Sequence, residues 1–446
     1  MRTWENIKTV LLTFLIFMSL LLTLVLWNYQ PEYDWLDDGT QYVHETKLDG
    51  KELAFKNVLS PLKVVLHQNN QHSSLLSASD QLGFYKKMSE WTLTNWTVLS
   101  DREIVLQADR LELVLPEEIP YSMIESLFVV ENRRDIPKSG SFSRIVFSIG
   151  DYQKNIYISF VPETGNNRLR AQILNANVMD VINDFISASM NNMDFMLFET
   201  RKGFPIYLPN GEVDLTKYTY STNRLDVQPL VNVLFSDPKL VRQSLSSDGE
   251  MYYTDGTRGM EVSQNDRYIE FINPPTSDFR ELNKEDLITQ SIDFMNDHAG
   301  WTDEYKLFSI DESTNTINYR LFVKEYPVFD YDNLAVIEQT WRDREIYQYR
   351  RPMIELATTF ESSETTTLRS GQSVIEYLEQ NQERYSTELI YDIAIGYFMQ
   401  QRADFSYIVS LEPSWFINYD GTWQRLTFVS DSIQMQGGSG NAVGTN

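Results

Sequence analysis

Residues 10–27 read VLLTFLIFMSLLLTLVLW. This stretch contains no charged residue, no proline and no glycine, and its only polar side chains are Thr13, Ser19 and Thr23. As a helix that rises about 1.5 Å per residue, it would be roughly 27 Å long, close to the thickness of the hydrocarbon core of a bilayer. The sequence therefore predicts a transmembrane helix over residues 9–29.

The charges on either side of this stretch indicate its orientation. Arg2 and Lys8 precede it, and four acidic residues follow it closely: Glu32, Asp34, Asp37 and Asp38. The positive-inside bias then predicts a cytoplasmic stub at residues 1–8 and an extracytoplasmic region of roughly 420 residues. A cleaved signal peptide is the alternative, but the apolar run is long and LWNYQPEYD lacks a small-x-small cleavage site. We expect an uncleaved anchor in the cell membrane.

One face of the predicted helix carries two of its polar side chains, Ser19 and Thr23. Ser19 and Thr23 form a small-xxx-small pair, which permits close approach and a hydrogen bond between helices. The alternative is that both hydroxyls bond to carbonyl groups of their own helix. We predict that this face contacts a partner helix, and it comprises Thr9, Leu12, Ile16, Ser19, Thr23 and Leu26.

The composition excludes several classes of function. Of the 446 residues, 42% are hydrophobic and 13% are aromatic, which is enough for two or three folded domains. The net charge of −25 would repel a nucleic acid, so no nucleic-acid partner is expected. The absence of cysteine excludes disulfides, thiolate catalysis and cysteine-based metal sites. This pattern suits the surface of a Gram-positive cell.

The outer region predicts an α+β fold, in which antiparallel sheets carry helices packed on one face. Strands are expected at residues 62–67 and at 111–115, where Pro116 would end the second strand. A meander at 144–149, 155–161 and 168–174 precedes a helix that starts at Asn177. Two helices, 284–299 and 373–381, each precede a strand meander, the second with strands at 406–411 and 415–419. The predicted domains are 30–200, 201–281 and 282–432, followed by a flexible tail at 433–446.

Searches for catalytic motifs return no active site. Two S-x-x-K matches begin at Ser60 and Ser236, but Ser60 precedes a strand, whereas penicillin-recognising enzymes place this serine on a helix. Asp330 and Asp332 are similar to the start of a calcium loop, but Leu334 and Ala335 occupy the positions that need an oxygen ligand and a glycine, so we interpret the segment as a solvated turn. Neither a P-loop nor a G-x-G-x-x-G motif occurs. We therefore predict no catalytic residue, no metal ligand and no cofactor.

The chain has four histidines, which are His44, His67, His72 and His298. His67 and His72 flank a polar turn with no acidic residue near them in the sequence, so a metal or catalytic role is disfavoured. We interpret all four as structural histidines at the surface or half-buried.

The membrane-proximal sequence resembles the YycH (WalH) family. The resemblance rests on Trp4, Glu5, Ile7 and Lys8 before the apolar stretch, and on Trp27, Tyr29 and QPEY (residues 30–33) after it. The turn YTDG at residues 253–256 is similar to the second domain of the family. The resemblance implies three extracytoplasmic domains, the last two related in fold to the protein YycI.

The same resemblance implies a function. A YycH-like protein would be an accessory regulator of the WalK–WalR (YycG–YycF) two-component system and would affect cell-wall metabolism. Its partners would be the sensor histidine kinase WalK, a YycI-like single-pass protein and the lipid bilayer. The resemblance implies regulation of the kinase and leaves open whether the kinase is activated or restrained. Two alternatives stay open from the residues alone, a surface enzyme that acts on the cell wall and a passive envelope scaffold.

Overall fold

The chain, in a computed structural model, divides into two compact units, residues 1–44 and residues 45–446. The first unit is helical at residues 4, 12 and 14–20, whose side chains are exposed. Among the described residues, no helix has the length and apolarity needed to cross a membrane. Most of the predicted span 9–29 and the whole predicted tail 433–446 lie outside the described residues. The structure describes residues 4, 12, 14–20, 47–74, 78–107, 109–148, 156–175, 178–189, 193–199, 204–246, 249–263, 267–275, 278–360, 364–402 and 405–428.

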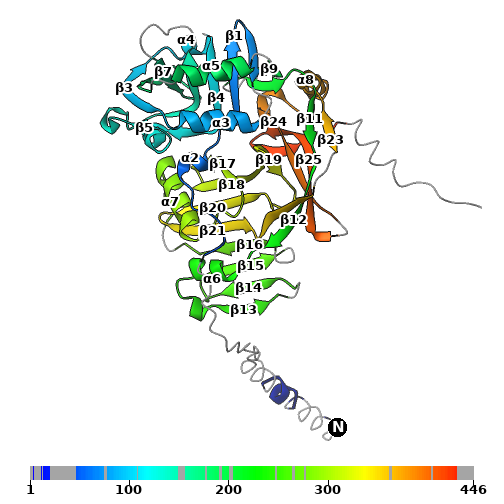
Figure 1. The fold of residues 1–446 in the computed structure, drawn as a ribbon. Helices are drawn as coiled ribbons and strands as arrows, with labels where there is room; N and C mark the ends of the chain where they lie inside the picture. Colours follow the sequence, from blue (N-terminus) through cyan, green and yellow to red (C-terminus); the bar gives the residue numbers. More distant parts are fainter. Residues whose placement is uncertain are drawn as a thin grey trace, which may run out of the picture. The chain divides into compact units, whose positions relative to one another are not determined.

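The second unit is mostly β-sheet with helices against the sheets, which confirms the α+β prediction (Figure 1). Its first sheet has ten strands in the order β10-β9-β2-β1-β4-β6-β7-β8-β3-β5, and only β3 and β5 pair in parallel. The strands are β1 (Lys63–Gln68), β2 (Gln71–Ser74), β3 (Thr92–Leu99), β4 (Arg110–Pro120), β5 (Val129–Val130), β6 (Ser141–Ser148), β7 (Ile156–Val161), β8 (Arg168–Ile173), β9 (Met193–Phe198) and β10 (Ile206–Pro209).

The two faces of this sheet differ in chemistry. Side chains alternate along a strand, so the register places Leu66, Leu111 and Phe147 on one face. Helices α3 (Ala78–Met88) and α5 (Val178–Ser189) cover that face, where Phe84 of α3 contacts Phe147 edge-on at 6.4 Å between ring centroids. The opposite face carries charged residues, and it holds the site described below.

Strand β4 is longer than predicted. We expected it to end at Pro116, but it runs to Pro120. Its pairing with β6 shifts register between Val114 and Ile119, so Pro116 lies in an irregular segment where the ladder needs no N–H from it. The prediction of a strand end was therefore wrong. The meander predicted after it is confirmed as β6, β7 and β8, paired antiparallel in sequence order.

The second sheet has fourteen strands and combines residues from the predicted middle and C-terminal domains. Its order is β13-β14-β15-β16-β21-β20-β18-β19-β24-β25-β12-β22, with β17 beside β18 and β26 beside β25. Strands from before and after residue 281 pair within this one sheet, since β16 pairs with β21. The predicted domain limits stay a prediction. The strands are β12 (Tyr218–Arg224), β13 (Arg242–Leu245), β14 (Met251–Thr254), β15 (Gly259–Ser263), β16 (Tyr268–Ile272), β17 (Tyr305–Asp311), β18 (Thr316–Val323), β19 (Tyr326–Phe329), β20 (Val336–Arg342), β21 (Glu345–Pro352), β22 (Ile354–Phe360), β24 (Ile390–Arg402), β25 (Phe405–Tyr419) and β26 (Thr422–Arg425).

Strand β25 corrects a second prediction. We expected two strands, 406–411 and 415–419, separated near Pro413, but β25 is continuous. Pro413 pairs with Tyr397 of β24. On its other side, β12 pairs only up to Leu411 and β26 pairs only from Phe416. A residue without an N–H is tolerated there because, within the described part of the chain, the second side of the strand has no ladder partner at that point.

The two long helices of this region begin at side-chain caps. Asn283 accepts a hydrogen bond from the Asp286 N–H at the start of α7 (Lys284–Asp297), as predicted. Ser370 accepts from the Ser373 N–H at the start of α8 (Gly371–Gln380), two residues before the predicted start. The predicted apolar faces of both helices are buried, and they comprise Leu287, Ile288, Ile292 and Met295 in α7 and Val374, Ile375 and Leu378 in α8.

Shorter elements complete the described fold. Asp237 caps a single 3-10 turn, η3 (Pro238–Leu240), where a short helix was predicted. The predicted turn at Asp255 and Gly256 is confirmed, since the Asp255 carboxylate accepts from the Thr257 and Arg258 N–H groups. The others are α2 (Phe55–Val58), α4 (Arg102–Gln107), α6 (Gln228–Leu234), η1 (Tyr121–Ser126), η2 (Arg133–Asp135), η4 (Thr387–Leu389) and the pair β11 (Val213–Thr216) and β23 (Thr365–Leu368).

The segment before α2 is bound to the end of α7. The Asn296 side chain accepts from the Leu53 N–H at 2.9 Å and donates to the Leu53 carbonyl at 3.0 Å. Gly50 lies so close that a Cβ would be 2.3 Å from the Ala299 carbonyl oxygen, which only glycine permits. Trp301 beside it is buried. The segment before α2 therefore packs against the end of α7, although the two are far apart in the sequence.

Candidate functional site

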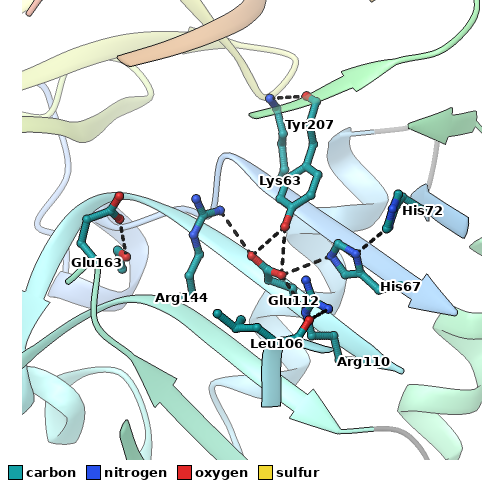
Figure 2. Close-up of polar contacts among 10 residues, drawn as sticks. Lys63, His67, His72, Leu106, Arg110, Glu112, Arg144, Glu163 and Tyr207 are labelled. Atoms are coloured by element: carbon teal, nitrogen blue, oxygen red, sulfur yellow. Dashed lines mark hydrogen bonds and ion pairs between the residues drawn. The ribbon is translucent and has the colours of Figure 1, made fainter. Parts of the chain in front are cut away.

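A buried ionic cluster lies on the charged face of the first sheet, centred on Glu112 of β4 (Figure 2). Strand β4 pairs with β1 and β6, and the register brings side chains from all three strands to the same face. The Glu112 side chain is 0% exposed. We call this the Glu112 cluster, and it comprises Glu112, Arg110, His67, His72, Arg144 and Tyr207.

Both carboxylate oxygens of Glu112 are occupied. Arg110 Nε donates to Oε2 at 3.0 Å, and the Tyr207 hydroxyl lies 3.1 Å from each oxygen. Arg144 Nη1 lies 3.5 Å from Oε1. Burial opposes the charge on this carboxyl, but the His67 contact and the two arginines lower its pKa below the ordinary value. Glu112 therefore stays ionised and is unsuited to act as a general acid.

His67 and His72 extend the cluster toward the surface. Their Nδ1 atoms lie 2.7 Å apart, and His67 Nε2 lies 3.2 Å from Glu112 Oε2 in poor alignment for a hydrogen bond. Burial lowers the pKa of both imidazoles, that of His72 to about 4. Both rings are therefore neutral at pH 7. The Glu112 carboxylate favours the His67 proton on Nε2, so His67 Nδ1 accepts a hydrogen bond from the Nδ1–H of His72. His72 is half-buried, while His67 is buried.

Arg144 and Phe204 close this face of the sheet. The Arg144 guanidinium lies 4.4 Å from the Phe204 ring centroid, and the Arg102 guanidinium lies 4.6 Å from it. Arg144 Nε has no hydrogen-bond partner among the residues that the structure describes, although Arg144 is only 8% exposed. The Phe204 ring therefore makes a cation–π contact with Arg102 and another with Arg144, which shares the Glu112 carboxylate with Arg110.

Lys63 connects this face to the second sheet. Its side chain runs beside Tyr207, and Nζ donates to the Tyr207 carbonyl at 2.7 Å and to the Ile393 carbonyl of β24 at 3.4 Å. Burial lowers the pKa of this amine, and the Asp392 carboxylate opposes the shift. The Lys63 ammonium thus links β1 to β24, where Ile393 lies 330 positions later in the chain.

Comparison with known proteins identifies the family. Residues 5–189 match the YycH protein N-terminal domain, and residues 205–432 match the YycH protein C-terminal domain. The chain belongs to the YycH family. The resemblance seen in the membrane-proximal residues is confirmed, since the two matches together extend over nearly the whole chain.

Two relatives cover most of this YycH-family chain. The "Two-component system WalR/WalK regulatory protein YycH" of Bacillus subtilis (strain 168) is 24% identical over 458 residues, which span 97% of this chain and 98% of that protein. The crystal structure of YycH from Bacillus subtilis matches with a TM-score of 0.73 at 22% identity, covering 85% of this chain and 99% of that one. The solved structure therefore shows the same fold.

The YycH-family fold corrects the interpretation of the histidines. We expected His67 to lie at the surface or half-buried with no acid nearby, but it is buried and Glu112 is its neighbour. The acid comes from β4, which pairs with β1 across 45 residues of sequence. One signal was present in the sequence, since the run RLELVL at 110–115 places two charged residues on the same face of an otherwise apolar strand.

The predicted membrane face of this YycH-family chain is described only in part. Leu12, Ile16 and Ser19 are helical with exposed side chains, and Leu12 is 60% exposed. Thr9, Thr23 and Leu26 lie outside the described residues, as does His44. The partner-binding role of this face stays a prediction.

The acidic residues singled out as similar to a calcium loop serve a turn instead. No group of three or more His, Asp or Glu side chains converges as metal ligands in the part of the chain that the structure describes. Asp330 accepts hydrogen bonds from the backbone N–H groups of Asp332, Leu334 and Ala335, so its oxygens are used to hold the turn. Asp330 is half-buried there, where we expected a solvated residue.

His298 is the second buried histidine, and it also differs from the expectation. It lies at the C-terminal end of α7 and is 0% exposed. Its Nδ1 lies 2.6 Å from the Phe294 carbonyl oxygen, and its Nε2 lies 3.3 Å from the Tyr349 hydroxyl. Burial, followed by the nearby Arg351 charge, lowers its pKa to about 3. The ring is therefore neutral, with Nδ1–H as donor and Nε2 as acceptor.

This histidine predicts a pH-dependent stability. Its pKa is about 3 in the folded chain and about 6.5 when unfolded, so protonation favours the unfolded state. Its contribution is complete above pH 6.5 and is lost as the pH falls toward 3. Between pH 7.5 and pH 5 we expect a loss of about 2 kcal/mol from His298 alone. Denaturant unfolding of the chain and of His298→Asn at both pH values measures this loss in the free energy of unfolding. An equal pH dependence in the two proteins would contradict the prediction.

Proposed function

We propose that this chain is a membrane-anchored regulatory protein of the WalR/WalK two-component system, which binds the sensor histidine kinase WalK together with a YycI-like protein. One observation supports this most directly, the similarity over 97% of the chain to the Bacillus subtilis protein named as a WalR/WalK regulatory protein. The apolar stretch at residues 10–27 is the proposed anchor.

The buried chemistry favours a regulator over an enzyme. In the Glu112 cluster, the carboxylate oxygens accept from Arg110 and Tyr207, and the site is buried. These partners keep the Glu112 carboxylate ionised and occupied, so it does not offer a proton to a substrate. A cell-wall enzyme is the competing proposal. Activity of the outer region in muramyl hydrolysis or penicillin acylation, abolished by one substitution, would overturn ours.

A regulator of this kind acts through differential binding. A partner shifts a two-state kinase only as far as it binds one state more tightly than the other. A difference of about 1.4 kcal/mol shifts the equilibrium tenfold. This requirement is modest for a helix that packs in the membrane, where interhelical hydrogen bonds contribute on the order of 1 kcal/mol.

The anchor provides the test of this proposal. We expect replacement of residues 10–27 by an unrelated membrane helix to change kinase output and reduce co-purification with WalK, while the outer region still folds. Within the native helix, Ser19→Leu combined with Thr23→Leu should have the same effect because it removes both hydroxyls from the predicted face. Thr13→Leu, about 90° from the centre of that face, is the matched control.

Unchanged co-purification and unchanged kinase output after the helix replacement would exclude a contact through the anchor. Loss of co-purification in Thr13→Leu as well would show that general changes to the helix, and not the predicted face, are responsible.

A further inference from the structure

A cavity of about 100 Å³ lies between the two sheets of the outer region. One side of it comes from the first sheet, through Lys63 of β1 and Tyr207 of β10. The other side comes from the second sheet, through β24 and the turn before β19. Strands β10 and β24 are in contact beside it. A molecule bound here would touch both sheets.

Most of the cavity wall is apolar and aromatic. The indole N–H of Trp415 donates to the Arg369 carbonyl at 3.0 Å, and the Arg320 guanidinium lies 4.6 Å from the Phe308 ring centroid. The Trp415 indole N–H and the Arg320 guanidinium therefore already have partners. The rings of Trp415 and Phe308 line the cavity as apolar surface. The aromatic residues of the wall are Phe195, Tyr207, Phe308, Phe322, Tyr326, Trp415 and Trp423.

Three charged side chains interrupt this apolar wall, namely Lys63, Asp392 and Glu325. The ammonium of Lys63 has two carbonyl acceptors for its three N–H groups. Among the described residues, no cation lies within 4 Å of the Glu325 carboxylate, and burial raises its pKa. Asp392 accepts from the Ile393 N–H with one oxygen. Donors and acceptors for both signs of charge thus line one small space.

We propose that this cavity binds a small zwitterion, a free α-amino acid with a short apolar side chain. Its carboxylate would accept from Lys63, its ammonium would donate to Asp392 and Glu325, and its side chain would pack against the aromatic rings. An anion alone would face two acidic side chains, and a cation alone would face Lys63. The size limit follows from the volume, since a cavity of about 150 Å³ holds benzene.

This inference goes beyond the proposed regulatory function and does not depend on it. Binding would stabilise the packing of the first sheet against the second, because the ligand contacts both. The affinity is limited by size: for about six non-hydrogen atoms we expect a Kd on the order of 0.1 to 1 mM.

Calorimetric titration of the full-length chain in detergent tests the ligand class. The probes are L-alanine, L-valine, L-phenylalanine, propionate and ethylamine. We expect one-to-one binding of alanine, and at least tenfold weaker binding of propionate and ethylamine, each of which lacks one charge. Valine has eight non-hydrogen atoms and should bind at least tenfold more weakly than alanine, and phenylalanine should not bind, because both exceed the cavity. Absence of alanine binding, or equal binding of propionate or ethylamine, would overturn the proposal.

Variants test the location. Ala394→Leu places extra side-chain volume at the cavity wall and should abolish binding, while Glu325→Gln should weaken it at least tenfold. Lys87→Met removes an exposed lysine of α3 and should leave binding unchanged. The unfolding midpoint of each variant shows that it is folded. If folded Ala394→Leu binds alanine as well as the original chain, the ligand lies elsewhere and the proposal is wrong.

Discussion

Substitution of Glu112 by Gln should lower the free energy of unfolding by about 3–5 kcal/mol, which is the usual effect of removing one partner from a buried ion pair. Gln has the same shape as Glu, so the loss is electrostatic and leaves no cavity. Arg110 is 11% exposed and Arg144 is 10% exposed at the side chain, so water cannot replace the missing charge. The amide nitrogen of Gln would also point a donor at one of the two arginines, since Arg110 and Arg144 lie at different oxygens of the carboxylate.

Denaturant unfolding of the chain without residues 1–44 measures this effect. Glu90→Gln is the matched control because Glu90 is exposed, and we expect a change within about 0.5 kcal/mol. A loss below about 1 kcal/mol for Glu112→Gln would show that water reaches the cluster. A double variant with Arg110→Met should recover part of the loss, since it removes one of the two uncompensated cations.

Trp301→Ala should also lower the free energy of unfolding by about 3–5 kcal/mol. Trp301 is 2% exposed and stands edge-on to Tyr319 with the ring centroids 4.9 Å apart. Its indole N–H donates to Asn296 Oδ1 at 2.9 Å, the atom that also accepts from the Leu53 N–H. Truncation therefore removes a large apolar contact and weakens the attachment of the segment before α2.

The Phe variant separates these two contributions. Trp301→Phe keeps most of the ring packing and loses the hydrogen bond, so we expect a loss of about 1–2 kcal/mol. Hydrogen exchange of the amides of Leu48 and Lys51, which donate to the His298 and Trp301 carbonyls, reports on the attached segment. Unchanged protection of these amides in Trp301→Ala would contradict the proposed attachment.

Local sequence patterns predicted the elements that depend only on residues close together in the chain. The meander β6, β7 and β8 follows from alternating side chains and from turns within a few residues. The caps at Asn283 and Asp237 need only a side chain and an N–H two or three residues later. Pro116 and Pro413 misled the prediction because their effect depends on whether a neighbouring strand needs their missing N–H, and that neighbour is distant in sequence.

The sequence by itself determined the apolar stretch at residues 10–27, the α+β class and the family, because these depend on composition and local order. Only the tertiary structure decided that His67 meets Glu112 and that Lys63 meets the Ile393 carbonyl. Those contacts join β1 to β4 and to β24, and strand pairing over such separations is set by the packing of the whole sheet. The pKa values of His67 and His298 follow from burial, which no local pattern specifies.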